Sequence, residues 1–163
     1  MALNEIKISF NEMKKVLESL FLKYSFSNEQ AKILAKIHAE STLDGINSHG
    51  INRVPIFLNY ITKGLVKIDS TPTLVESLGS IERWDGNLGS GVLNAITCTN
   101  KAVQLAKTSG IGLIALRNTN HWMRGGTYGW QAAEHGCISI MFTNTAPNMP
   151  AWGGKENRIG NNP

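Results

Sequence analysis

The first third of the chain carries apolar side chains at helical spacing, interrupted by short polar breaks. From about residue 11 to residue 24 they recur every three or four positions, which predicts an amphipathic helix capped by Ser9 or Asn11. The segment before it, residues 6–10, is expected to be a short strand or an extended entry to the helix. A second helix is expected over 27–43, because it opens on the S-x-x-Q pattern of a capping box.

Beyond a glycine-containing break the pattern changes from helices alone to alternating strands and helices. A third helix is expected over 52–63, with Pro55 tolerated because it falls in the first turn. Further along, the pattern predicts strands over 73–78, 81–84, 111–116 and 137–142, and helices over 90–107 and 129–134. This alternation is typical of an α/β layer. We therefore expect an N-terminal helical segment, residues 1–70, followed by the first part of an α/β domain, residues 71–163.

Composition narrows the functional classes. The 163 residues, 42% hydrophobic and 17% charged, fit a globular domain rather than a disordered chain. The net charge of +4 is spread along the chain, without the run or stripe typical of nucleic-acid binding. A small basic nucleic-acid-binding module is therefore kept only as an alternative. A mild positive balance suits a small anionic substrate equally well.

The cysteines and the apolar runs indicate where such a protein works. Cys98 and Cys137 are far apart and belong to no C-x-x-C pair, so neither a zinc site nor a disulfide framework is expected. This usage fits a reducing cytoplasm. The sequence shows no signal-peptide pattern and no apolar run of membrane-spanning length, so no membrane association is expected.

The segment Ser48-His49-Gly50-Ile51-Asn52-Arg53 is the first candidate site. If a helix begins here, His49 and Arg53 share one face because they are four residues apart. An arginine holds a carboxylate through two parallel hydrogen bonds, and a nearby histidine can protonate a carbonyl oxygen. This pair therefore suits reduction of a 2-oxo acid. The alternative is a plain helix cap, with Ser48 capping and both other side chains in solvent.

The second candidate is the loop over 118–126, which follows the expected strand 111–116. It places His121 among asparagines, Trp122, Arg124 and two glycines, at a strand end where α/β proteins often hold their sites. The alternative is a turn-rich loop whose tryptophan packs in the core.

Two further segments have weaker patterns. Residues 86–91 are glycine-rich and precede a helix, but they lack the G-K-[ST] of a phosphate loop, so a glycine-rich helix start is expected. Thr143 and Thr145 belong to a cluster of hydroxyls and amides after the expected strand 137–142. That cluster could bind a nicotinamide or its phosphates, or it could be an ordinary group of turns.

Three long stretches of the sequence resemble one family. They are SHGINR, ALRNTNHWMRGGTYGWQAAEHG and MFTNTAPNMPAWGGKENRIGNNP, and they resemble the type 2 malate/L-lactate dehydrogenases over nearly the whole chain from about Ser9. The resemblance implies an oxidoreductase that reduces a 2-oxo acid with NAD(P)H, on a mixed α/β domain that is not a Rossmann fold. The stretch over 120–134 is most similar to the branch acting on 2,3-diketo-L-gulonate. That branch implies NADH, with NADPH as the alternative, and a homodimer.

The resemblance also implies roles for particular residues. His49 matches the proton donor of the diketogulonate branch, and Arg53 matches the arginine that would hold the substrate carboxylate. His121 matches the histidine assigned as acid/base in the ureidoglycolate branch, so the two histidines compete for the role, and we rank His49 first. Ser48 and Thr143 would line the same cleft on the substrate side, and Thr145 matches a hydroxyl position near the cofactor. No metal ligand is implied.

Two departures from the family pattern matter. Asn161 stands where the family commonly has a threonine, in a G-T-N-P motif. Family members also continue for about as many residues again, and the further part supplies most of the NAD contacts. We therefore expect a truncated, N-terminal half of such an enzyme. The competing hypothesis is a catalytically inactive remnant that at most pairs with another protomer.

Overall fold

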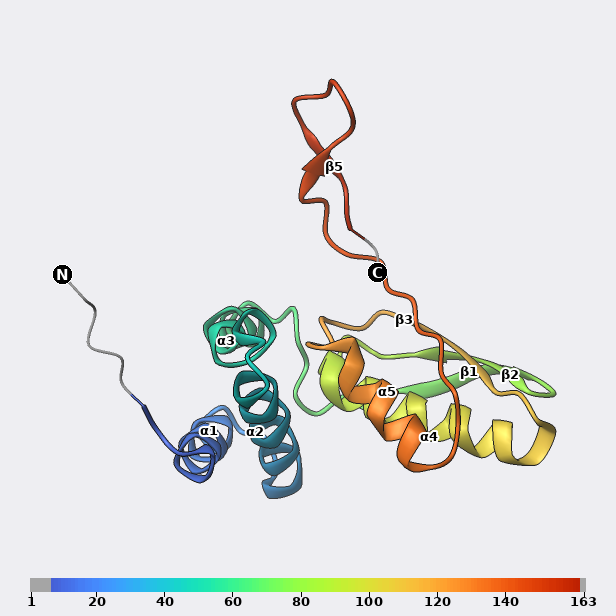
Figure 1. Cartoon of the computed structure of the whole chain (residues 1–163), viewed down its shortest axis with the longest axis horizontal. Coiled ribbons are helices and arrows are strands. Elements are labelled where there is room, and N and C mark those ends of the chain that lie inside the picture. Colours follow the sequence, from blue (N-terminus) through green and yellow to red (C-terminus); the bar gives the residue numbers. More distant parts are fainter. Residues whose placement is uncertain (1–6, 162–163) are drawn as a thin grey trace.

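The computed structural model describes residues 7–161, and its elements fall into three regions (Figure 1). Helices α1, α2 and α3 lie together at one side. A three-stranded sheet with helices α4 and α5 along one face lies at the other, and a C-terminal hairpin extends away from both. The fold is mixed α/β, which confirms the predicted class.

The helical region is built on two capping boxes. α1 spans Phe10–Lys23, and its cap Ser9 exchanges hydrogen bonds with Glu12. α2 spans Asn28–Leu43, and Ser27 does the same with Gln30, as predicted. These bonds satisfy N–H groups that would otherwise lack partners at a helix start.

Of the two possibilities expected for residues 6–10, the extended entry is the one that forms, and Ser9 has extended backbone angles. Residue 6 lies outside the described residues, and residues 7–9 form no strand. The physical reason is the capping box, which fixes Ser9 as the cap and makes Phe10 the first helical residue.

The third helix is shorter than the pattern predicts. Two turns of 3-10 helix, η1 (Asn47–His49) and η2 (Ile51–Arg53), come first, and α3 then spans Val54–Thr62. Gly50 between the two turns lies directly against α2, where an added Cβ would be 2.3 Å from Thr42 Oγ1. Thr42 Oγ1 also accepts a hydrogen bond from Ile51 N at 2.8 Å. His49 and Arg53 therefore lie on separate turns and not on one face of a continuous helix.

The core of this region is aromatic and contains a histidine. Phe21 and Phe57 are buried, and their ring centroids lie 5.4 and 6.0 Å from that of His38. His38 is itself fully buried, and its Nδ1–H donates to Leu34 O at 2.7 Å. Burial lowers the pKa of His38, so this side chain is neutral in the folded core.

The sheet has the strand order β1-β2-β3. β1 (Thr73–Leu78) runs antiparallel to β2 (Ile81–Asp85), and β3 (Leu113–Arg117) runs parallel to β2. The crossover is α4 (Gly91–Ser109), which ends on Gly110 in the left-handed conformation. The loops after β2 and after β3 therefore meet at one edge of the sheet, as the carboxyl ends of parallel strands do.

The C-terminal part departs most from the pattern. α5 spans Gly125–Glu134 and begins four residues before the predicted start. The strand predicted over 137–142 is absent, although the segment is extended, with Ile138 99% and Phe142 83% exposed. A strand requires a neighbouring backbone to bond with, and the described part of the chain places none beside it. The chain ends in an unpredicted hairpin of β4 (Met149–Pro150) and β5 (Asn157–Ile159).

Within residues 7–161 no helix is both long and apolar enough to cross a membrane.

Candidate active site

Two of the predicted site histidines meet in the structure. His49 comes from η1, beside the end of α2, and His121 comes from the loop after β3. Their ring centroids lie 5.4 Å apart with the planes tilted by 38°. Both side chains are half-buried. The fold therefore joins two sequence motifs, 72 positions apart, into one site.

Ser48 and Gly50 hold His49 on either side. The Oγ of Ser48 lies 2.9 Å from Nδ1 of His49, within hydrogen-bond distance. Gly50 anchors the same turn to α2 through the close approach described above. Ser48 thus acts on the ring it was expected to accompany, and it does not cap a helix with its side chain.

A backbone hydrogen bond fixes the ring of His121. The N–H of Met123 donates to Nδ1 of His121 at 3.0 Å. Because Nδ1 accepts this bond, the neutral ring carries its proton on Nε2. The preceding residue, Asn120, fastens the loop by donating to Leu65 O at 3.0 Å.

Arg53 supplies the positive charge of the site. Burial is the largest cause that lowers the pKa of His121 to about 4, and the charge of Arg53 adds to it. Burial and then Arg53 also lower the pKa of His49. Both imidazoles are therefore neutral at pH 7 beside one guanidinium, an arrangement that attracts an anion and offers it a ring N–H donor.

The loop that carries His121 is held by a residue that sequence reasoning missed. Asn94 of α4 is fully buried, and its Nδ2 donates to Gly86 O and to Thr119 Oγ1, both at 2.9 Å. A Cβ at Gly91 would lie 2.0 Å from Asn120 O, so the backbone passes directly over this helix start. The chain itself occupies the space beside Gly86 and Gly91, and α4 begins at Gly91, which confirms the predicted helix start. A buried polar residue inside a helix was the signal that could have identified Asn94.

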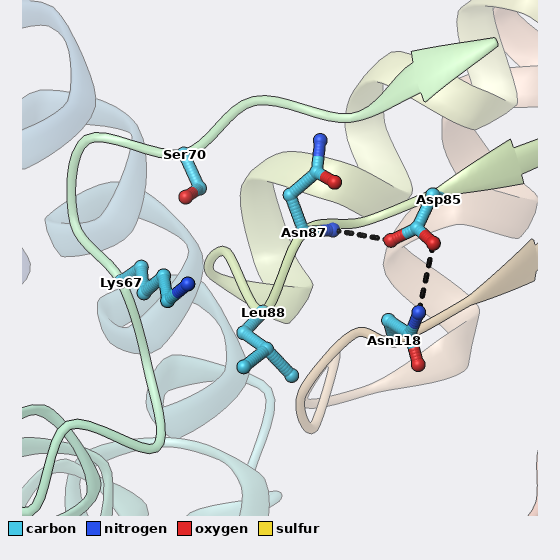
Figure 2. A pocket seen from close by; sticks show the side chains of 6 residues that line it. All are labelled: Lys67, Ser70, Asp85, Asn87, Leu88 and Asn118. Atoms are coloured by element: carbon cyan, nitrogen blue, oxygen red, sulfur yellow. Dashed lines mark hydrogen bonds between the residues drawn. The ribbon is translucent and has the colours of Figure 1, made fainter.

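A shallow depression of about 380 Å³ lies at the same edge of the sheet. Figure 2 shows the residues that line it. Lys67 reaches towards the loop after β2, and Asp85 is hydrogen-bonded to Asn87 and Asn118. Asp85 accepts from Asn87 N at 2.9 Å and from Asn118 Nδ2 at 2.8 Å. These bonds, that from Asn87 first, lower the pKa of Asp85. The carboxylate therefore fastens the two loops together.

The threonines predicted to contact the cleft and the cofactor lie elsewhere. Thr143 and Thr145 belong to the extended segment that leads into the C-terminal hairpin, which Figure 1 shows projecting from the body. Thr145 Oγ1 lies 3.3 Å from Asn161 Oδ1, within the same arm. The structure thus brings Ser48, His49, Arg53 and His121 together and leaves Thr143 and Thr145 apart from them. Among residues 7–161 no group of three metal-ligating side chains is present.

Comparisons with known proteins show which sequences and folds this chain is similar to. Residues 8–163 match the sequence model of the malate/L-lactate dehydrogenase family. The chain is 45% identical over 158 residues to the 2,3-diketo-L-gulonate reductases of Escherichia coli O1:K1 and of Mannheimia succiniciproducens, covering 97% of this chain and 48% of each relative. It therefore spans about half the length of these curated relatives.

Solved structures give the same coverage. Malate dehydrogenase from Pyrococcus horikoshii superposes with a TM-score of 0.91 at 31% identity, over 97% of this chain and 45% of that one. Sulfolactate dehydrogenase from Methanocaldococcus jannaschii gives a TM-score of 0.90 at 32% identity, over 97% and 46%.

Proposed function

We propose, on the premise that this chain belongs to the malate/L-lactate dehydrogenase family, that it serves in the reduction of a 2-oxo acid to a 2-hydroxy acid. The observation that carries the proposal is the cluster of Arg53 with two neutral imidazoles, whose ring centroids are 5.4 Å apart. The family relationship supports an oxidoreductase, and the cluster supplies the groups that a 2-oxo acid needs.

The two ends of the substrate require different partners. The carboxylate would pair with Arg53, because a guanidinium offers two parallel donors to two carboxylate oxygens. The 2-oxo oxygen would then lie towards the imidazoles, one of which gives it a proton as the carbonyl carbon is reduced. Ser48 would keep the His49 ring oriented through Nδ1.

The electrostatics favour His49 over His121 as the proton donor. A bound carboxylate would offset the charge of Arg53, which is one cause of the lowered pKa of His49. Substrate binding would therefore raise the pKa of His49 and favour its protonated form. His121 is more strongly shifted, to about 4, and its Nδ1 is occupied by Met123 N–H. We assign His121 a different role, in which its neutral ring donates a hydrogen bond from Nε2–H to the carbonyl oxygen and keeps its proton.

The hydride donor, the substrate, the cellular location and the oligomeric state are also part of this proposal. Reduction of a carbonyl adds a hydride at carbon and a proton at oxygen, and the cluster accounts for the proton alone. NADH, or alternatively NADPH, is proposed as the hydride source because of the family. That group would supply the hydride, and the residues of this chain would supply the proton. By similarity to the 45% identical 2,3-diketo-L-gulonate reductases we propose a 2,3-diketo-L-gulonate-like substrate. From the cysteine usage and the family resemblance of the sequence we also propose a cytoplasmic location and a homodimer.

The test separates binding from turnover. We would measure NADH oxidation with 2,3-diketo-L-gulonate, pyruvate and oxaloacetate, and thermal stability with oxamate, a non-reducible analogue of pyruvate. A ligand that binds the folded state must raise its melting temperature. The expected results are an oxamate shift that Arg53→Gln abolishes, and turnover that His49→Gln lowers by about 10²–10⁴-fold.

His135 provides the matched control, because it is an exposed histidine at the end of α5. His135→Gln should change neither readout. An oxamate shift without turnover would place substrate binding, but not catalysis, in this chain. No response in either assay would contradict the proposal.

A further inference from the structure

An ion pair connects the two segments that carry the site histidines. Asp44 Oδ2 pairs with Nη1 of Arg124. Asp44 is the C-cap of α2, five residues before His49, and Arg124 is the N-cap of α5, three residues after His121. The pair therefore bridges the helical region and the loop after β3 at the same place where the two imidazoles meet.

Each of these charges is unfavourable for its own helix. A helix carries a partial positive charge at its N-terminus and a partial negative charge at its C-terminus. Asp44 adds a negative charge at the end of α2, where the last turn has no basic residue. Arg124 adds a positive charge at the start of α5, where the first turn has no acidic residue. Local helix stability thus explains neither residue, whereas their mutual pairing explains both.

The two glycines after Arg124 leave room for neighbouring side chains, Gly126 for Arg124 and Gly125 for Trp122. A Cβ at Gly126 would lie 3.2 Å from Nε of Arg124, so the guanidinium folds back over the first turn of α5. A Cβ at Gly125 would lie 3.3 Å from the ring of Trp122. The R-G-G sequence is therefore explained by how the loop around His121 packs, with Arg124 turned towards Asp44.

We propose that Asp44 and Arg124 are positioning residues that hold the imidazoles of His49 and His121 in contact. The coupling itself follows from the geometry, and its value for catalysis rests on the proposed function. Exposed ion pairs add little net stability, and these side chains are 51% and 28% exposed. The main effect of the pair is therefore expected on the geometry of the site and not on the melting temperature.

The experiment follows the two rings in the ligand-free chain by NMR. Single variants Asp44→Asn and Arg124→Gln should weaken the cross-relaxation between the ring protons of His49 and His121. They should also move the titration midpoint of His121 upwards, towards about 6.5, because water reaches the ring. An upward shift of the His121 midpoint in both variants would distinguish a change in ring position from a direct effect of the lost charge. Through direct electrostatics, loss of a negative charge would lower that midpoint and loss of a positive charge would raise it.

Charge reversal and a matched ion pair complete the design. The double variant Asp44→Arg with Arg124→Asp restores the pair and places each charge at the favourable helix end, so ring contact and midpoint should return to the parent values. Glu40→Gln removes the exposed Lys36–Glu40 ion pair from α2, the helix that Asp44 caps. It should change neither the ring contact nor the titration midpoint. Unchanged ring contacts in both single variants, or midpoint shifts in opposite directions, would overturn the proposal. Because no substrate is used, this outcome is separate from any failure of the proposed function.

Discussion

Replacement of Asn94 by leucine tests whether one buried amide holds the loop that positions His121. The change keeps the side-chain volume and removes two hydrogen bonds, both 2.9 Å long, to Gly86 O and Thr119 Oγ1. Gly86 is buried, so its carbonyl loses this partner where water cannot easily replace it, at a cost of about 1–3 kcal/mol. Thr119 is exposed, so its hydroxyl turns to solvent at a cost of roughly 0.5–1 kcal/mol.

Together these losses predict that the free energy of unfolding falls by about 1.5–4 kcal/mol. Urea unfolding followed by circular dichroism should show a midpoint lower by roughly 1–2 M, for a typical slope of about 2 kcal/mol per M. Thr119→Val is the matched control, because it removes the exposed end of the network and leaves the bond to Gly86, and it should cost less than about 1 kcal/mol. If Asn94→Leu costs no more than Thr119→Val, the buried amide does not hold the loop.

Two further predictions concern the packing and the ionisation of the histidines. Gly50→Ala should lower the melting temperature and weaken the ring contact between His49 and His121, since the new Cβ would lie 2.3 Å from Thr42 Oγ1. Circular dichroism and NMR on Gly129→Ala give the comparison, because this position is helical and its Cβ would meet only Ser139 Oγ, at 3.9 Å. The urea midpoint should fall as the pH drops from 7 to 5, because His38 and His121 have lowered pKa values and the unfolded chain binds protons that the folded chain does not. His121→Gln should flatten this dependence, and an unchanged slope would show that His121 titrates normally.

The parts of the fold that were predictable are those with local causes. Capping boxes at Ser9 and Ser27 fix the first turns of α1 and α2 within four residues of sequence, and the structure places both helix starts there. The hairpin of β1 and β2 is equally local, because Gly79 supplies the positive φ of the turn. Periodicity and caps contain this information, since they act within a few residues.

The parts that were missed depend on distant neighbours. The segment over 137–142 has the composition of a strand, but no strand among residues 7–161 pairs with it, so no ladder forms. The helix expected from residue 52 is displaced because Gly50 and Ile51 bond and pack against α2. In each case a strong local pattern yields to what lies beside it in space.

The candidate site shows the same division. His49, Arg53 and His121 were chosen from their chemistry, and the structure brings them together. Asn94, Asp44 and Arg124 were not chosen, because their importance is visible only once two separate segments are adjacent. The pairing of the histidines likewise had no counterpart in any spacing rule, since the motifs lie on different elements.

The positions of two glycines account for the meeting of the histidines. Gly50 allows the turn that carries His49 to lie on α2, with Thr42 Oγ1 2.3 Å from where a Cβ would be. Gly91 allows the backbone of Asn120 and His121 to cross the start of α4, where a Cβ at Gly91 would lie 2.0 Å from Asn120 O. A glycine at such a contact indicates close backbone approach and not a ligand site, because the chain already occupies the space. The glycines of this sequence therefore mark the contacts that build the site, while the histidines and the arginine supply its chemistry.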